Sequence, residues 1–322
     1  MLKITGIGHQ NIIKKNKIEN NNQSMLIYRK WRLGDIIMCE PVNRYWSQNG
    51  YNVSFCSFAQ YHPIIKSFYN IKPKTISYNM NKTGEFLPSG YQYNIEHNLD
   101  IVGLLHEGHV SKVEAFLSAA NIDYNNIDPE YKIPKLQVNT FNQSWAKTML
   151  KDNGNLQDCP LIAIIRQSFS MQSPRSIPLH ILDELYKLLS KDFHVLVLGE
   201  KPLSISVVKN IHNFTGCTPD IMSVAGLLEQ CKLLVTADTG LMHLAGSIGV
   251  PMVSILGPTR PEDISLFYEH NTIIDAGREC SPCFDRGCDK RCLEEIDANF
   301  IYNHIIDRIN APFIDTMIIK SR

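Results

Sequence analysis

The sequence predicts an α/β protein with two domains, each built on a parallel sheet. Short and nearly continuous apolar runs, such as 161–165, 194–198 and 252–256, alternate with amphipathic stretches. This pattern is typical of parallel strands that helices cover on both faces. The chain has 322 residues, and a single hydrophobic core usually stops growing below that size. An irregular polar stretch over 129–155 separates two series of strands and helices, so we place the domain junction near residue 150.

The predicted units are a polar N-terminal extension over 1–24, an N-terminal domain over 25–150 and a C-terminal domain over 151–322. The extension lacks the apolar core of a signal peptide. No apolar run approaches the roughly 20 residues that span a bilayer. The odd total of nine cysteines fits a reducing compartment. We therefore expect a cytoplasmic protein without a transmembrane segment, and peripheral attachment to an inner membrane stays an open alternative.

The charge balance argues against a general nucleic-acid-binding protein. Lys and Arg together number 32, and Asp and Glu together also number 32. A balanced chain has no overall field that would attract nucleic acid or an anionic membrane surface. We therefore expect partners that are recognised at a local site and do not expect nucleic acid among them.

The first strand-helix-strand unit contains an acidic turn. An apolar run at 25–28 leads through Gly34-Asp35 into an apolar stretch with helical spacing over 36–46, and 53–56 alternates as a second strand. Asp35 stands at a strand-to-helix turn, where a carboxylate can face a site. The alternative is that Asp35 is the N-cap of a helix that begins at Ile36.

A second acidic turn follows the apolar strand 233–236 in the C-terminal half. Asp238 or Thr239 can cap a helix that opens near Leu241, and Gly240 allows close approach of a ligand to the backbone. A helix N-terminus at the carboxyl edge of a parallel sheet is a favourable seat for a diphosphate. His243 would lie in the first turn of this helix. The alternative is an ordinary capped helix.

The continuous segment 238–261 resembles the signature of the heptosyltransferase family, glycosyltransferase family 9. In that family Asp-Thr-Gly-Leu-x-His-Leu leads through a helix to Gly-Val-Pro, a strand and Gly-Pro-Thr-x-Pro, and this sequence has each of these elements. The Gly34-Asp35 turn resembles the family's first turn. Arg175-Ser-Ile-Pro178 stands where members carry Lys/Arg-x-Trp-Pro, with Ile177 in place of Trp. The resemblance covers roughly 25–310 and is thin between 70 and 150.

The resemblance implies the GT-B fold, in which two Rossmann-like domains face each other across a cleft. It implies an inverting glycosyltransferase that moves a sugar, heptose from ADP-heptose first of all, to a lipopolysaccharide core or another bacterial surface glycan, including a lipid-linked acceptor. No cofactor is required for catalysis in this family. Asp35 would be the catalytic base, and Gly34 and Arg32 would lie on the acceptor side. The implied donor-binding residues are Arg175, Glu200, Asp238, Thr239, Gly240, Leu241 and His243, with Ser168.

Cysteines cluster near the end of the C-terminal domain, over 280–292. Cys280, Cys283, Cys288 and Cys292 have the spacing C-x2-C-x4-C-x3-C, which can close a tetrahedral site for structural zinc or iron. The alternative is a set of reduced or disulfide-paired cysteines without a metal. Many heptosyltransferase-like sequences carry a similar Cys-x-Pro-Cys stretch, so the cluster is compatible with the resemblance.

Other functions stay open at this point. One is a family member with a different sugar nucleotide or a protein acceptor, because the acceptor half of the sequence is too divergent to identify its substrate. Another, of a different class, is a non-catalytic GT-B scaffold or a metal-cluster binding module. The joint presence of Asp35, Arg175 and His243 argues against an inactive scaffold.

Overall fold

The computed structural model describes most of the chain in a series of segments. They are residues 23–30, 32–71, 73–77, 93–102, 110–166, 175–200, 202, 208–277, 279–281, 283 and 292–321. The predicted extension over 1–24 lies almost wholly outside these segments, and the first strand begins at Ser24.

The N-terminal domain is built on a parallel sheet of four strands in the order β3-β2-β1-β4. Each described pairing in this sheet is parallel, with Ile27 of β1 opposite Phe55 of β2 and His97 of β4. The middle of β1 and all of β2 after Asn52 are buried, as expected for strands covered on both faces. The strands are β1 (Ser24–Tyr28), β2 (Asn52–Ser57), β3 (Lys74–Ser77) and β4 (Ile95–Asn98).

The C-terminal domain is built on a parallel sheet of seven strands in the order β11-β10-β9-β8-β5-β6-β7. Its central strands β5, β8 and β9 are buried along their whole length. The strands are β5 (Leu161–Ile165), β6 (His194–Val197), β7 (Ile211–Asn213), β8 (Leu233–Ala237), β9 (Met252–Leu256), β10 (Asn271–Asp275) and β11 (Met317–Lys320). Two parallel-sheet α/β domains are therefore present, and the predicted fold class is confirmed.

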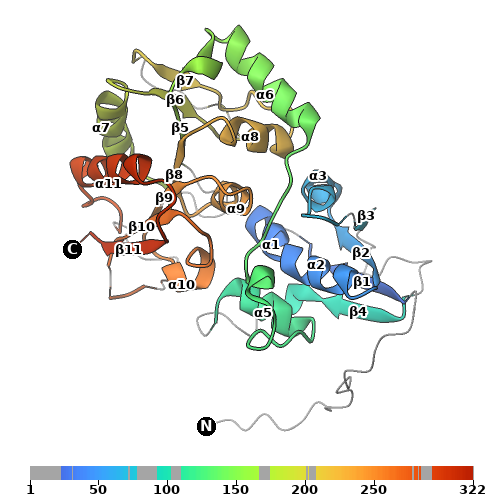
Figure 1. Ribbon diagram of the computed structural model, residues 1–322. Helices are drawn as coiled ribbons and strands as arrows, with labels where there is room; N and C mark the ends of the chain where they lie inside the picture. The colour runs from blue at the N-terminus through green and yellow to red at the C-terminus, as the bar shows by residue number, and fades with distance from the viewer. Residues whose placement is uncertain are drawn as a thin grey trace.

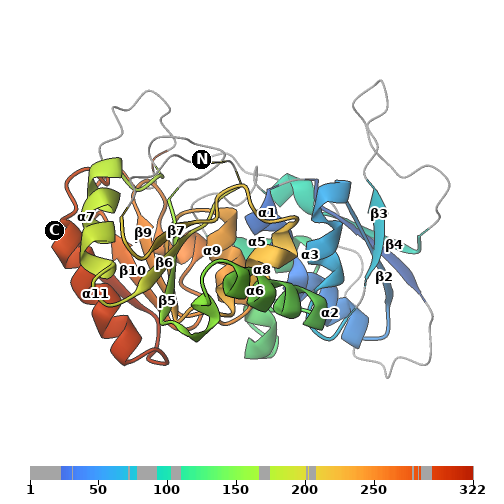
Figure 2. The same ribbon diagram turned by 90° about the horizontal axis from the view of Figure 1, so that it is seen from above.

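Helices cover both sheets, and Figures 1 and 2 show the two domains side by side with α1 and α9 between them. The helices are α1 (Leu33–Met38), α2 (Glu40–Gln48), α3 (His62–Lys66), α5 (Lys112–Ala119), α6 (Thr140–Asp152), α7 (Leu179–Leu189), α8 (Ile221–Leu228), α9 (Gly240–Ser247), α10 (Pro261–Ile264) and α11 (Ala298–Asn310). Short 3-10 turns are η1 (Ala59–Tyr61), η2 (Leu99–Ile101), η3 (Pro129–Lys132) and η4 (Leu156–Asp158). Among the described helices, none is long and apolar enough to cross a membrane.

The helix predicted over 36–46 is in fact two helices. α1 ends at Met38, and α2 begins at Glu40 with Pro41 in its first turn. Proline lacks the backbone N–H that a helix interior needs, but it is tolerated in a first turn. Pro41 therefore marks a new helix start within the apolar stretch.

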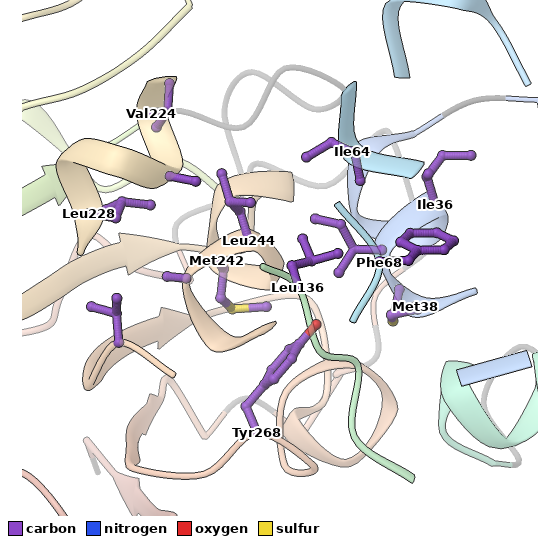
Figure 3. Close-up of a cluster of buried hydrophobic side chains, with 14 of the residues drawn as sticks. Ile36, Met38, Ile64, Phe68, Leu136, Val224, Leu228, Met242, Leu244 and Tyr268 are labelled. Carbon is purple, nitrogen blue, oxygen red and sulfur yellow. The ribbon is translucent and has the colours of Figure 1, made fainter. Parts of the chain in front are cut away.

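One hydrophobic cluster extends across both domains (Figure 3). Ile36, Met38 and Phe68 come from the N-terminal domain, and Met242 and Leu244 from α9. Each of these side chains is at most 1% exposed, and burial of a side chain of this size contributes about 1.5–3 kcal/mol. The cluster therefore holds the two sheet domains against each other. A separate cluster packs α7 and α11 on the opposite face of the C-terminal sheet (Figure 2).

The segment between the domains contacts the same interface. Leu136 packs in the shared cluster, and its N–H donates to the carbonyl oxygen of Ser247, the last residue of α9, at 2.9 Å. α6 follows and packs against α8 of the C-terminal domain, although it lies before the predicted junction near residue 150 apart from its last residues. The exact domain boundaries stay a prediction.

Candidate active site

The first acidic turn lies where β1 gives way to α1. Arg32 precedes the helix with a φ of 70° and an exposed side chain, and its N–H donates to the Tyr61 hydroxyl at 3.2 Å. The helix begins at Leu33, so Asp35 lies inside its first turn. The alternative that Asp35 is the N-cap of a helix starting at Ile36 is therefore wrong.

The Asp35 carboxylate is almost fully buried between two cations. Arg29 donates to Oδ2, and Lys112 of α5 donates from Nζ to Oδ1 at 3.2 Å. Asp35 is 4% exposed. Burial alone would raise its pKa, but the charges of Lys112 and Arg29 hold the pKa of Asp35 below its ordinary value. The carboxylate is therefore ionised and has both oxygens engaged.

The second acidic turn joins β8 to α9. Thr239 is the N-cap of α9, and its hydroxyl accepts a hydrogen bond from the N–H of Met242 at 3.3 Å. The helix starts at Gly240, one residue earlier than the sequence predicts. Its first turn presents backbone N–H groups and the positive end of the helix dipole at the carboxyl edge of the sheet. This is the geometry in which proteins seat anionic groups.

Asp238 is fixed beside this helix start by two side chains from other loops. Arg175 Nη1 lies 3.0 Å from Asp238 Oδ2, and the Thr259 hydroxyl donates to the same oxygen at 2.6 Å. Asp238 is 5% exposed, whereas a quarter of the Arg175 side chain is exposed. The loops after β8 and β9 and the segment before α7 therefore meet at one point. The guanidinium of Arg175 is partly open to solvent there.

The two acidic turns meet across the domain interface through paired glycines. A Cβ atom on Gly34 would lie 2.4 Å from Cδ2 of His243, and a Cβ atom on Gly240 would lie 2.8 Å from Cβ of Leu33. Real Cβ atoms essentially never come this close to another heavy atom. Glycine at both positions therefore lets α1 and α9 approach each other at their N-terminal ends.

His243 is the point at which charges from both domains converge. The ring is 4% exposed, and Nδ1 lies 3.1 Å from the Tyr268 hydroxyl. Burial lowers the pKa of His243 to about 4, although the carboxylates of Asp238 and Asp35 act against this shift. The charges of Lys112 and Arg175 lower the pKa further. His243 is therefore a neutral hydrogen-bonding ring at neutral pH.

For the remaining predicted site residues, the structure gives at most a position and a degree of burial. Leu241 is half-buried in the first turn of α9, and Glu200 is exposed just after β6. Glu200 thus lies on the carboxyl side of a sheet strand, as do Asp238 and Thr259. Ser168 lies outside the described residues. The donor-side roles of these residues stay predictions.

The cysteine cluster is only partly described. Cys280 is exposed, Cys283 is half-buried and Cys292 is buried. Cys288 lies outside the described residues. In the segments that the structure describes, no three His, Cys, Asp or Glu side chains are grouped so that they could hold a metal ion. The N–H of Cys283 donates to the carbonyl oxygen of Pro258 at 2.8 Å, so this loop is tied to the segment after β9. The metal site stays a prediction.

The sequence pattern around two residues of this site does not indicate their role. Lys112 is a surface-type residue at the start of α5, 77 positions from the carboxylate that it contacts. Tyr268 follows α10 in a stretch without clear periodicity. Only the packing of α5 against α1, and of Tyr268 against α9, brings these side chains to the site.

Part of the C-terminal domain matches a known family in sequence. The model of "Glycosyltransferase family 9 (heptosyltransferase)" matches residues 210–294. Lipopolysaccharide heptosyltransferase 1 of Pseudomonas aeruginosa is 32% identical over 77 residues, which are 23% of this chain and 22% of that protein. This aligned stretch thus spans about a fifth of the length of that curated relative.

Similarity to solved structures extends over nearly the whole chain. A family 9 glycosyltransferase from Veillonella parvula has a TM-score of 0.74 at 13% identity, covering 92% of this chain and 100% of that one. The E. coli ADP-heptose lipopolysaccharide heptosyltransferase II has a TM-score of 0.63 at 16% identity, covering 90% of this chain and 99% of that one. At these identities the likeness establishes the fold, which is GT-B.

The family signature in the C-terminal domain and the fold of both domains thus agree. The matched segment contains β8, the N-cap of α9 and Thr259, whose hydroxyl contacts Asp238. The chain thus resembles the heptosyltransferase family, glycosyltransferase family 9, by a family match over residues 210–294 and by the GT-B fold over nearly its whole length.

Proposed function

We propose that this protein is an inverting glycosyltransferase that uses a nucleoside-diphosphate sugar, ADP-heptose first of all. The acceptor would be a hydroxyl group of a lipopolysaccharide core or another bacterial surface glycan. The observation that carries the proposal is the convergence of charges on His243. A buried carboxylate and a lysine from one domain, and an aspartate and an arginine from the other, act on the same ring. This arrangement supports a base on one side of the domain interface and a diphosphate site on the other.

The C-terminal side of the site would hold the donor. The backbone N–H groups at the start of α9, capped by Thr239, and the guanidinium of Arg175 would bind the diphosphate. Asp238, held by Thr259, fixes the guanidinium in place. His243 stays neutral and would act through hydrogen bonds. Gly240, Leu241, Glu200 and Ser168 are proposed to complete this subsite.

The N-terminal side would hold the acceptor next to Gly34 and Arg32. In the proposed step, the acceptor hydroxyl oxygen forms a bond to the anomeric carbon of the sugar. The bond from this carbon to the diphosphate oxygen breaks, and the hydroxyl proton passes to Asp35. Attack from the face opposite the leaving group inverts the configuration. The leaving diphosphate takes the electron pair and is stabilised by Arg175 and the helix amides, so no cofactor is needed in this step.

The descriptions of the similar proteins support the proposed substrates. The proteins reported above are described as an ADP-heptose lipopolysaccharide heptosyltransferase and a lipopolysaccharide heptosyltransferase. We propose a cytoplasmic enzyme, with peripheral association with the inner membrane as a possible addition to this location. A different sugar nucleotide or a protein acceptor is the second candidate, because residues 70–150 diverge too far from the family to identify the acceptor.

Ligand binding and a base variant test this proposal together. The melting temperature of the full chain is measured with ADP, UDP, GDP and their sugars, because a ligand that binds only the native state raises it. We expect ADP or ADP-heptose to raise the melting temperature. An Asp35→Asn variant should keep this response and lose sugar transfer. A complete lack of response to any nucleotide would overturn the donor site, and unchanged transfer by the variant would overturn the base assignment.

The cysteine cluster is proposed to hold a structural zinc or iron ion. Cys280, Cys283, Cys288 and Cys292 would be its ligands, and the tie between Cys283 and Pro258 would link the ion to the loop after β9. Elemental analysis of protein purified without chelators tests this. Less than about a tenth of an equivalent of any transition metal would count against a resident ion.

A further inference from the structure

The proposed base has no free oxygen in this structure. Arg29 donates to Oδ2 of Asp35, and Lys112 donates to Oδ1 at 3.2 Å. A general base must offer one oxygen to the hydroxyl group from which it takes the proton. Each oxygen could accept a second donor, but Asp35 is only 4% exposed, so a hydroxyl has room beside an oxygen only if one of the two cations moves.

Arg29 is built into the domain and cannot leave easily. Its side chain is 9% exposed, its Nη1 donates to the carbonyl oxygen of Leu99 at 3.1 Å, and its guanidinium lies over the ring of Phe116. Asp100 lies 3.7 Å from the same guanidinium. If Arg29 moved, these contacts would be lost and a charge would stay buried without its partners.

Lys112 is placed to move. Its side chain is 31% exposed, and it stands at the first position of α5 with a flexible four-carbon stem. Its ammonium group can turn towards solvent without uncovering the core. The position that it occupies beside Oδ1 is then the one an acceptor hydroxyl would take.

We propose that Lys112 is a positioning residue that covers Oδ1 of Asp35 in the empty enzyme and moves to an anionic group of the acceptor, a phosphate or a carboxylate, when the acceptor binds. This inference rests on the proposed role of Asp35 as the base. Lys112 stays protonated throughout and only changes its anionic partner, so it takes no part in the proton transfer itself. Asp35 thus becomes free only when a charged acceptor is present.

The exchange has a chemical advantage for a transferase. While Lys112 covers Oδ1, a water molecule cannot use Asp35 as a base, and the donor sugar is protected from hydrolysis. When the ammonium group of Lys112 moves away, the pKa of the Asp35 carboxyl group also rises, and Asp35 becomes a stronger base as the acceptor arrives. The groups that continue to act on Asp35 are Arg29 after β1, Arg32 before α1, Cys39 at the end of α1 and His243 of α9.

The test measures the pKa of Asp35 directly in the full chain. Aspartate labelled with 13C at the carboxyl carbon is observed by NMR over a pH series, and Asp35→Asn identifies the signal. In Lys112→Met the pKa of Asp35 should rise by about one pH unit or more relative to the wild type. Lys112→Arg should keep it close to the wild-type value. Lys151→Met, which removes an exposed lysine of α6, is the matched control and should leave it unchanged.

Inorganic phosphate then serves as a probe for the anionic group. Added phosphate should raise the pKa of Asp35 in the wild type, because it draws Lys112 away, and should have no effect in Lys112→Met. An Asp35 pKa that does not change in Lys112→Met, or that phosphate leaves unmoved in the wild type, would overturn the inference. So would an equal response of both proteins to phosphate.

Kinetics provide a second readout and separate this inference from the proposed function. In Lys112→Met the KM for a charged acceptor should rise about tenfold, the donor KM should stay constant, and donor hydrolysis without acceptor should increase. The NMR titration needs no substrate. It can therefore fail while transfer is found, which sinks only the role of Lys112, or succeed while no donor binds, which sinks only the transferase.

Discussion

The imidazole ring of His243 fills the space in which a side chain at Gly34 would lie. A Cβ atom on Gly34 would come within 2.4 Å of Cδ2 and 3.0 Å of Nε2 of this ring. The two residues belong to different domains. Gly34 forms part of the turn that contains Asp35, and His243 follows the turn that contains Asp238. The proposed base and the proposed donor site can therefore lie close together because residue 34 has no side chain.

Gly34→Ala should push the two domains apart. Because the contact is with a buried ring, we expect the free energy of unfolding to fall by about 1–3 kcal/mol. We also expect transfer to fall at least about tenfold, since a displacement of the reacting groups by even 1 Å is costly. Chemical denaturation and steady-state kinetics measure the two effects.

Gly199→Ala is the matched control for this change. A Cβ atom there would lie 3.5 Å from Thr215, which is an ordinary contact, so its stability should stay close to that of the wild type. A double-mutant cycle of Gly34→Ala with His243→Ala isolates the contact, because the alanine at 243 removes the obstacle. If Gly34→Ala costs the same with and without the imidazole ring, the ring is not what requires glycine.

Arg175→Met should weaken donor binding. Arg175 is the partly exposed cation beside the start of α9, and Asp238 holds it in position. A hydrogen bond to a charged group contributes about 1.5–3 kcal/mol, so the affinity for ADP should fall about tenfold or more. Isothermal titration calorimetry gives the dissociation constant. Lys232→Met removes an exposed lysine at the opposite end of β8 and serves as the control. Equal affinities in the two variants would remove Arg175 from the donor site.

Much of the C-terminal domain follows from local sequence patterns. The strands 161–165 and 252–256 are found where continuous apolar runs predict them, because a fully buried parallel strand is such a run bounded by turn residues. The turn at Asp238 and Thr239 is equally local. Its cap, helix start and strand all lie within one short stretch of sequence.

The electrostatic partners could not be predicted in this way. Whether Asp35 contacts Lys112 depends on how α5 packs against α1, and nothing in the sequence around Lys112 distinguishes it from a solvated lysine. The Tyr268 contact with His243 likewise depends on the packing of the two side chains beside Gly246. Long-range pairs of this kind follow from tertiary packing, whereas capped turns follow from adjacent residues.

Because of the raised pKa of Glu40, we expect an unusual dependence of the free energy of unfolding on pH. Glu40 is fully buried at the domain interface, and burial raises its pKa to about 7, although Arg44 at 2.8 Å and the N–H of Lys135 act against this shift. A carboxyl group with a raised pKa binds its proton more tightly in the folded state. Its stabilising contribution is therefore complete below the pKa of about 4.5 that it has when unfolded, and is lost as the pH rises through about 7.

Between about pH 5 and pH 8 this loss amounts to about 2.5 kcal/mol for one such group. Urea denaturation at a series of pH values should show it as a fall in the free energy of unfolding. Glu40→Gln should flatten the curve in this range, whatever its effect at a single pH. Glu96→Gln, at an exposed position on β4, should leave the slope unchanged. A slope that persists in Glu40→Gln would assign the pH dependence to other groups.

Gly226→Ala tests whether α6 is part of the C-terminal domain. A Cβ atom on Gly226 would lie 2.5 Å from the backbone oxygen of Asn142, which cannot turn away as a flexible side chain could. We therefore expect a loss of about 1–3 kcal/mol, relieved by movement of α6 away from α8. Hydrogen exchange shows which unit is weakened. If α6 belongs with the C-terminal sheet, amide protection should fall in β5 and β8 and hold in β1 and β2. Loss of protection that is confined to β1 and β2 would instead assign α6 to the N-terminal domain.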